Sequence, residues 1–310
     1  MPLTLYIPDF HRAYEAAGRP RLPALELLVA RARQQTAVAG EAFLAGRFGL
    51  APGALQPGPF MRLGDGAAAD TGYWLCAEPV HLAPDRDQLI LLPEPLLQVR
   101  REEADALAAA FDGLYGAEGW KLEMLNPARG YLRCPKPLDV ATHAPGGVAG
   151  SAVLDYMPTG PDSTALKQLM NEMQMLFHTH PVNQAREEAG RPLINSLWFW
   201  GGGVLPLYEK QPVPEVMSDL PLLRGLARWS GREPQAPAPE RAEATHLVGL
   251  AADDVTALER DWFAPLLQGL KGANLKELHL YLDGIGLLEL NTTSVRRFWR
   301  KRRPLSQVSP

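Results

Sequence analysis

Cysteine and long hydrophobic runs are scarce in this sequence. Only Cys76 and Cys134 are present, far apart and without a neighbouring Cys or His at metal-ligand spacing, so we expect two core thiols rather than a disulfide or a zinc site. No run approaches the ~20 apolar residues that cross a bilayer, and residues 1–9 lack the charged start and apolar stretch of a signal peptide. We therefore expect a cytoplasmic protein without a membrane span.

Familiar catalytic signatures are missing as well. The sequence has no HExxH, GxSxG or GxGxxG, and the glycines at 201–203 are not followed by the Lys and Ser or Thr of a phosphate-binding loop. Three acidic pairs, at 102–103, 187–188 and 253–254, fall in predicted helices or helix starts, where solvent or the helix dipole is the ordinary partner. These gaps favour a protein that is not an enzyme, and we expect no cofactor.

The chain does have enough apolar sequence for a large core. Of its 310 residues 46% are hydrophobic and 21% are charged, which predicts one large domain or two that pack together. The net charge of −4 is uneven, because six positive charges lie within 296–303 and leave −10 for the remainder. The residues of this basic segment are Arg296, Arg297, Arg300, Lys301, Arg302 and Arg303.

The basic segment, 296–303, has two interpretations. Its cations, with Phe298 and Trp299 between them, could contact nucleic acid, an anionic membrane or an acidic protein partner. The alternative is a C-terminal helix whose cations complement its own dipole and pair with the acidic remainder of the chain. We favour this alternative and expect no nucleic-acid partner.

Both ends of the chain predict a parallel α/β layer. The apolar run at 3–7 predicts a first strand, and apolar residues at helical spacing predict a helix over 23–35. Apolar runs at 246–250 and 275–282 predict two further strands, which flank a helix at 254–271. Strands that alternate with helices favour a mostly parallel sheet.

The middle of the chain has a different pattern. Between residues 73 and 135, two strand-like runs precede a helix over 101–115 and two follow it. Antiparallel strands joined by short turns segregate from parallel ones. We therefore predict an inserted α+β (ββαββ) subdomain at 71–189 and an α/β core formed by 1–70 and 190–310.

A candidate ligand site follows this unit. Apolar periodicity predicts a helix over 163–180, capped by Asp162 or Ser163 and with His180 in the core. The apolar run at 194–200 predicts a strand buried on both faces of the parallel sheet. It leads into three glycines, which either let a ligand approach the backbone or form a tight turn beneath the tryptophans.

Polar side chains near those glycines offer amide and guanidinium donors for a carboxylate or a phosphate, although each alone is more often structural. The candidate ligand-binding residues are Asn171, Gln174, His178, Asn183, Arg186, Asn195, Gly201, Gly202 and Gly203.

These blocks resemble two protein families. The segment containing NEMQMLFHTHPVNQAR and NSLWFWGGG is similar to the part of archaeal-type, cofactor-independent phosphoglycerate mutases in which an inserted domain ends with a helix, an HPVN-like turn and a glycine-ended strand. More of the chain resembles the RpfE-type regulatory proteins of proteobacteria, through RFGL (47–50), AEPVHL (77–82) and the same later blocks. This second resemblance implies a bacterial regulatory protein.

The mutase resemblance implies a reduced alkaline-phosphatase-type fold and a definite chemistry. That superfamily uses two divalent metals, held by Asp and His side chains, and a Ser or Thr nucleophile soon after the first strand. Thr36 is a poor candidate for this nucleophile, and the rest of 5–70 contains no Ser or Thr. The resemblance places three remnants of the metal ligands, Asp9, Asp253 and Asp283, and Gly284 stands where the family has a His. We expect no metal.

Three hypotheses of function remain open. The first is a catalytically degenerate, phosphoglycerate-mutase-like regulatory protein that binds a small anionic metabolite. The second is a divergent metal-dependent phosphomutase or phosphatase with an all-carboxylate site made of Asp9, Asp253, Asp254 and Asp283. The third is binding of nucleic acid or a protein partner through the basic segment.

Overall fold

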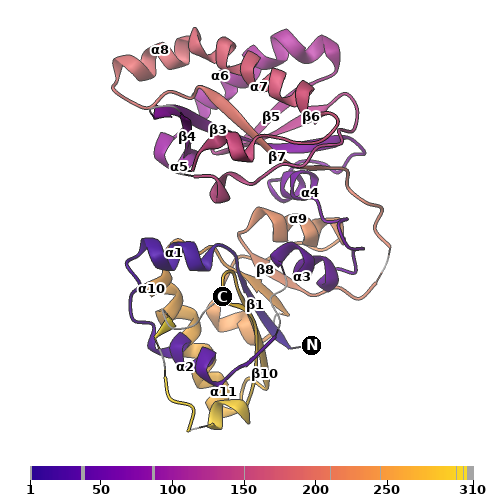
Figure 1. Cartoon of the computed structure of the whole chain (residues 1–310). Helices are drawn as coiled ribbons and strands as arrows, with labels where there is room; N and C mark the ends of the chain where they lie inside the picture. The colour runs from indigo at the N-terminus through magenta and orange to yellow at the C-terminus, as the bar shows by residue number, and fades with distance from the viewer. Residues whose placement is uncertain are drawn as a thin grey trace. The chain divides into compact units, whose positions relative to one another are not determined.

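The computed structural model describes residues 2–35, 39–85, 88–149, 151–209, 211–244, 246–297, 299–302 and 304–305. The chain divides into two compact units (Figure 1). The core unit consists of residues 1–55 and 208–310, and the inserted unit consists of residues 56–207. The sequence predicted an insertion at 71–189, so the observed unit is longer at both of its ends.

The core unit contains a six-stranded sheet in the order β2-β11-β10-β1-β9-β8. Strand β1 pairs in parallel with β9 and β10, β8 pairs in parallel with β9, and β11 is antiparallel to both β10 and β2. This parallel-rich sheet confirms the predicted α/β class. The strands are β1 (Leu3–Ile7), β2 (Arg33–Gln34), β8 (Val216–Ser218), β9 (Leu247–Gly249), β10 (Glu277–Leu282) and β11 (Gly286–Asn291).

Helices cover this sheet on both faces. They are α1 (Phe10–Ala16), α2 (Pro23–Arg31), α3 (Gly40–Arg47), α9 (Pro221–Trp229), α10 (Val255–Leu258) and α11 (Ala264–Gly272). Between α10 and α11 the chain forms a π-helical turn, η5 (Glu259–Phe263), and short 3₁₀ turns occur at η4 (Pro239–Ala244) and η6 (Ser294–Arg296).

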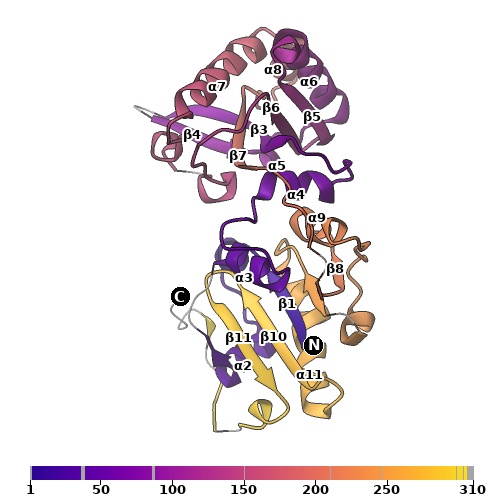
Figure 2. The same ribbon diagram turned by 90° about the vertical axis from the view of Figure 1, so that its right-hand side faces the viewer.

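The two faces of the sheet differ in chemistry because side chains alternate along a strand. Leu3, Leu5 and Ile7 of β1 join an apolar cluster with residues of α2 and α11. The intervening side chains, Thr4 and Tyr6, face α3, which lies over β1 and β10 in Figure 2. The second face is therefore polar and aromatic.

The inserted unit contains an antiparallel sheet of five strands, in which the long strand β3 pairs with β4, β6 and β7, and β6 pairs with β5. The predicted ββαββ order is confirmed by β3, β4, α6, β5 and β6. The strands are β3 (Tyr73–Asp85), β4 (Gln88–Pro93), β5 (Lys121–Asn126), β6 (Arg129–Cys134) and β7 (Ser196–Gly203). The helical segments are α4 (Pro57–Gly64), α5 (Glu94–Leu97), α6 (Arg101–Tyr115), η1 (Gly116–Glu118), η2 (Pro145–Gly147), η3 (Val153–Tyr156), α7 (Ser163–His178) and α8 (Pro181–Glu188).

Strand β7 corrects one prediction. It was expected in the parallel core, but it pairs antiparallel to β3, with Cys76 opposite Trp200 and Val80 opposite Ser196. Helices α4 and α7 both pack against β7, so its apolar sequence reflects burial by helices rather than a place in a parallel sheet.

The helix expected over 163–180 is also interrupted. Helix α7 ends at His178, and Pro181 begins α8, because proline is tolerated in the first turn of a helix but not in its interior. The imidazole of His180 accepts a hydrogen bond from Val182 N at 3.2 Å and caps α8, so His180 is not a core residue. Asp162 precedes α7, but its carboxylate accepts from Asp139 N (2.8 Å) instead of capping the helix.

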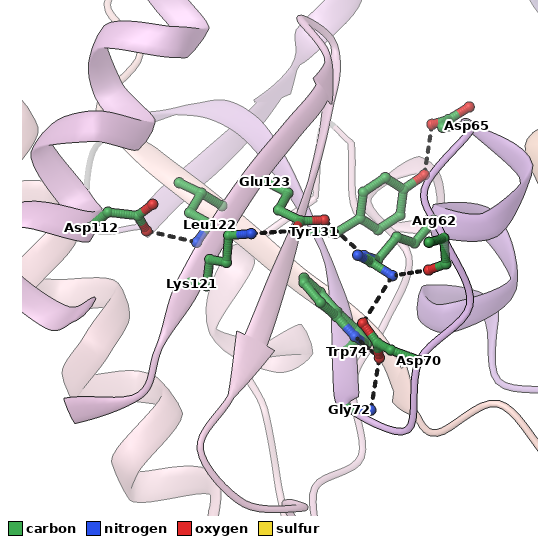
Figure 3. A network of polar contacts seen from close by, with 11 residues as sticks. Arg62, Asp65, Asp70, Gly72, Trp74, Asp112, Lys121, Leu122, Glu123 and Tyr131 are labelled. Carbon is green, nitrogen blue, oxygen red and sulfur yellow. Dashed lines mark hydrogen bonds and ion pairs between the residues drawn. The ribbon is translucent and has the colours of Figure 1, made fainter. Parts of the chain in front are cut away.

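A network around Arg62 holds α4 against the sheet of the inserted unit (Figure 3). Its Nε donates to Glu123 at 2.8 Å, Nη1 lies 3.3 Å from Asp70, and the guanidinium lies 3.8 Å from the centroid of the Trp74 ring. The Arg62 charge is buried among two carboxylates and an aromatic face, which makes it a structural residue.

Cys76 and Cys134 are buried, unpaired thiols, as expected. Burial raises the pKa of both, that of Cys134 to about 12, so neither is a reactive thiolate at neutral pH. Among the described residues, no helix is both long and apolar enough to cross a bilayer.

Candidate functional site

The parallel strands β1, β9 and β10 lie side by side and end at one edge of the core-unit sheet. The segments that follow them carry Asp9, Asp253 and Asp283, and Asp283 N donates to the carbonyl of Ile7 at 3.2 Å. Ligands of open α/β sheets bind outside the carboxyl ends of the strands. This edge is therefore the candidate site.

A cavity of about 560 Å³ opens on one side of β1, and we call it the Asp9–Asp253 cavity. Its ionised groups are Asp9, Arg12 and Asp253, and the other lining residues are apolar. The lining consists of Pro8, Asp9, Arg12, Ala13, Ala16, Ala17, Leu220, Ala251, Ala252 and Asp253. Two carboxylates and one guanidinium thus stand around an otherwise apolar space.

Asp9 has an unusual backbone at the start of α1. Its φ of 55° is in the left-handed region, which Asp enters more readily than most residues. The Asp9 carboxylate lies 3.3 Å from Nη2 of Arg12, one turn along the same helix. The Asp that the mutase resemblance assigns to a metal therefore has a cationic partner within this chain.

A second cavity, of about 320 Å³, opens on the other side of Asp9, and we call it the Tyr6 cavity. It is lined by Tyr6, Pro8, Asp9, Ala39, Gly40, Glu41, Tyr281 and Asp283. The rings of Tyr6 and Tyr281 are register partners on β1 and β10 and stack with centroids 5.0 Å apart. A Cβ on Gly40 would lie 2.6 Å from the Tyr6 hydroxyl and 3.3 Å from that of Tyr281. Glycine is thus required where α3 begins above these hydroxyls.

Both phenols remain protonated at neutral pH. Burial raises the pKa of Tyr281 to about 12, and the charge of Asp283 adds to this effect. Burial also raises the pKa of Tyr6, with additions from Tyr281 and the nearby carboxylates. The two hydroxyls can therefore both donate and accept hydrogen bonds.

The residues at this edge do not fit the two-metal centre that the mutase resemblance implies. Among the described residues, no group of three or more His, Cys, Asp and Glu side chains is placed to hold a metal ion. Asp254 is occupied as the cap of α10, where its carboxylate accepts from Thr256 N (2.9 Å) and Ala257 N (3.0 Å). Ser and Thr are absent from the described lining of both cavities, and Thr36 lies outside the described residues.

Three of the predicted ligand-binding residues are structural instead. Asn183 is buried, and its amide bonds the backbone of Phe177 and Ile194. The Asn195 amide pairs with the backbone of Leu82 at 2.7 and 3.0 Å. Arg186 is fully buried and donates to Glu103 and to two backbone carbonyls. These side chains connect segments of the inserted unit through their hydrogen bonds.

The remaining side chains of that set lie on α7. Asn171 and His178 are exposed, Gln174 is half-buried, and none of them lines either cavity.

The glycines 201–203 are required for packing. Gly201 has a φ of 65°, and a Cβ there would lie 2.9 Å from Pro57. A Cβ on Gly202 would lie 2.8 Å from Leu75, and one on Gly203 would lie 2.5 Å from Gln56. The absence of side chains at these glycines lets β7 lie against β3 and the start of α4. Protein atoms therefore occupy the space in which a ligand was expected to approach the backbone.

The basic segment does not form the expected helix. After the 3₁₀ turn η6, Arg297 donates to the carbonyl of Arg31 (3.4 Å) and Arg300 to that of Ala32 (3.0 Å). Arg302 lies 3.8 Å from the buried carboxylate of Glu26. Arg297 and Arg300 thus cap the C-terminal end of α2, whereas Arg302 contacts its first turn. Arg296 and Lys301 are exposed, and Arg303 lies outside the described residues.

Sequence reasoning missed Arg12, Tyr6, Tyr281 and Glu41. Arg12 carries a sequence signal, since it lies one helical turn after Asp9. The tyrosines belong to apolar strand runs, and their pairing depends on the register of β1 with β10, which a single sequence does not reveal.

The chain is similar in sequence to phosphoglycerate mutases. It is 27% identical over 161 residues to a probable 2,3-bisphosphoglycerate-independent phosphoglycerate mutase of Geobacter sulfurreducens, a match covering 49% of this chain and 40% of the relative. It is 31% identical over 144 residues to the corresponding mutase of Methanosarcina barkeri, covering 44% and 36%. Each match thus spans less than half of the relative's length.

A cofactor-independent phosphoglycerate mutase from Thermoplasma acidophilum aligns with 94% of this chain and 90% of its own, at 15% identity and a TM-score of 0.42. No family model matches the chain. The sequence relatives are thus phosphoglycerate mutases, and the similarity of this chain to them is partial.

Proposed function

We propose that this protein is a phosphoglycerate-mutase-like binding protein that holds a small hydroxylated acid in the Asp9–Asp253 cavity without transferring a phosphoryl group. One observation carries the proposal: Asp9 is paired with Arg12 at 3.3 Å, and the described carboxylates at this edge form no group that could hold a metal. Phosphoryl transfer of the family type needs metals to activate a hydroxyl and to neutralise the transferring group.

The lining of the cavity suggests the class of ligand. Arg12 supplies a guanidinium for a carboxylate or phosphate, whereas Asp9 and Asp253 supply acceptors for hydroxyl groups. A ligand whose anionic group displaces Asp9 from Arg12 brings a further negative charge next to Asp9 and Asp253. Hydroxyl groups on the same ligand can offset this by donating hydrogen bonds to those two carboxylates. The ligand is therefore a small acid that also carries hydroxyl groups.

The ³¹P NMR spectrum of 3-phosphoglycerate, mixed with the protein and Mg²⁺, tests binding and turnover together. The proposal predicts a broadened substrate signal and no 2-phosphoglycerate signal. Arg12→Gln removes the broadening, and Arg260→Gln, an exposed arginine outside the cavity that pairs with Asp261, retains it. Appearance of 2-phosphoglycerate, or a spectrum unchanged by the protein, contradicts the proposal.

The names of the relatives favour a second candidate, a working phosphoglycerate mutase. The same spectra distinguish it, because only a mutase produces 2-phosphoglycerate. A regulatory role of the RpfE type is part of the first proposal, since a protein that binds without turnover acts through its bound state. The all-carboxylate phosphatase is disfavoured because Asp254 caps α10.

A further inference from the structure

Two tyrosines with buried rings line the Tyr6 cavity, and their hydroxyls have no hydrogen-bond partner among the described residues. Tyr6 is 6% exposed and Tyr281 is 3% exposed, and both line the cavity beside Gly40. Within the described part of the chain, neither hydroxyl makes a hydrogen bond. Neither hydroxyl oxygen is enclosed by protein, so both can donate to and accept from a ligand in the cavity.

The charges of the Tyr6 cavity determine the sign of that ligand. Asp9, Glu41 and Asp283 line it, and its described lining includes no Lys, Arg or His. Arg12 neutralises part of the Asp9 charge from the other side. Glu41 and Asp283 are then the lining carboxylates without a basic side chain in the described lining. The N-terminal amides of α3 favour anions, but Glu41 lies in that first turn and offsets them. The cavity therefore attracts a cation.

The spacing of the carboxylates determines the kind of cation. The three carboxylates do not form a described group that could hold a metal ion together. A volume of about 320 Å³ is that of a small-molecule site. A polyatomic cation with separated charges fits both observations.

We propose that the Tyr6 cavity binds a small organic diamine, whose ammonium groups donate to the hydroxyls of Tyr6 and Tyr281 and to the carboxylates of Glu41 and Asp283. This site is distinct from the proposed hydroxy-acid site, although Asp9 lies between them. The aromatic stack of Tyr6, Tyr281 and Phe43 fixes the two hydroxyls in position before the ligand arrives.

Calorimetric titration of the full chain with putrescine at low ionic strength tests the proposal. Putrescine binds more tightly than butylamine, which has one ammonium, and than tetramethylammonium, which has no N–H donor. Tyr6→Phe keeps the ring and removes the hydroxyl, and we expect about tenfold weaker binding, the usual effect of losing one hydrogen bond to a charged group. Asp283→Asn and Glu41→Gln weaken binding as well.

The matched control is Glu188→Gln, an exposed carboxylate on α8 of the inserted unit, which leaves putrescine affinity unchanged. Thermal unfolding verifies that each variant is folded, and the exposed Asp283→Asn variant carries the test if Tyr6→Phe does not fold. The proposal is overturned if putrescine does not bind, if tetramethylammonium or Mg²⁺ binds as tightly, or if Asp283→Asn binds like the unaltered protein. Tyr6→Phe leaves the 3-phosphoglycerate spectra unchanged, which separates this site from the Asp9–Asp253 cavity.

Discussion

Glu103 is a buried carboxylate held by three donors in the inserted unit. It accepts from Arg186 Nη1 at 2.7 Å, from Arg191 Nη2 at 2.5 Å and from Arg100 N at 2.9 Å. Burial alone would raise its pKa, but the hydrogen bonds and the two guanidinium charges outweigh burial and hold the pKa of Glu103 below its ordinary value. The charged form is therefore a stabilising feature of the fold.

We expect Glu103→Gln to lower the free energy of unfolding by about 3 kcal/mol at pH 7, because it leaves the buried Arg186 without its counter-charge. Since the folded-state pKa is lowered, the stabilisation is present above the unfolded carboxyl pKa of about 4.3 and is lost as pH falls through the folded value. Urea unfolding at neutral and acid pH measures the unfolding free energies of the unaltered protein and of Glu103→Gln. The difference between these two free energies should become smaller below about pH 4.

Glu102→Gln is the matched control for this prediction, because Glu102 is exposed on the same helix, α6. It should change stability by less than about 0.5 kcal/mol. Equal effects of the two substitutions would contradict the assignment. The sequence places both residues in a helix with solvated acidic side chains, and it cannot reveal that Glu103 alone turns toward Arg186 from α8.

Helix α2 is capped at both ends by side chains from distant segments. The carboxylate of Glu259, in the π-helical turn η5, accepts from Ala24 N (2.5 Å) and Leu25 N (3.1 Å) at its start. Arg297 and Arg300 donate to the last carbonyls of α2. Negative charge at the start of a helix and positive charge at its end both stabilise the helix through their interaction with its dipole.

The double substitution Arg297→Gln, Arg300→Gln should destabilise the core unit by about 1 kcal/mol, the sum of two modest C-terminal dipole interactions. Lys301→Gln, in the same exposed segment, should have no measurable effect. Thermal unfolding compares the variants. If the segment instead serves nucleic-acid binding, the double variant keeps its stability and loses a salt-dependent affinity for DNA or RNA.

Local sequence pattern predicts many of the helices and strands, but it misses α1, α3, α9, β8 and β11, and it does not predict how the strands pair. The residues of α6 match the prediction, and β1, β9 and β10 occupy the predicted apolar runs. Strand β7 was assigned to the wrong sheet. An apolar run indicates that a strand is buried, but it does not indicate which strand it pairs with or whether the pair is parallel. The basic segment was expected to cap its own helix and caps α2 instead, a contact between residues far apart in sequence.

At the scale of the whole molecule, the two units have separate cores, one around β1 and one around β3. The predicted ligand residues all lie in the inserted unit, whereas both cavities lie in the core unit. The sequence resemblance selected Asp9, Asp253 and Asp283, and the structure shows that they follow adjacent parallel strands at one sheet edge. Tyr6 and Tyr281 also lie at that edge, and their pairing depends on the register of β1 with β10.

The described residues at the edge formed by β1, β9 and β10 do not assemble a two-metal centre. Titration of the metal-free full chain with Mn²⁺, followed by calorimetry and by metal analysis after dialysis, tests this absence directly. The arrangement of Asp9, Arg12, Asp253 and Asp283 predicts weak binding and no retained metal. Two retained equivalents of Mn²⁺ that disappear in Asp9→Asn would contradict the account.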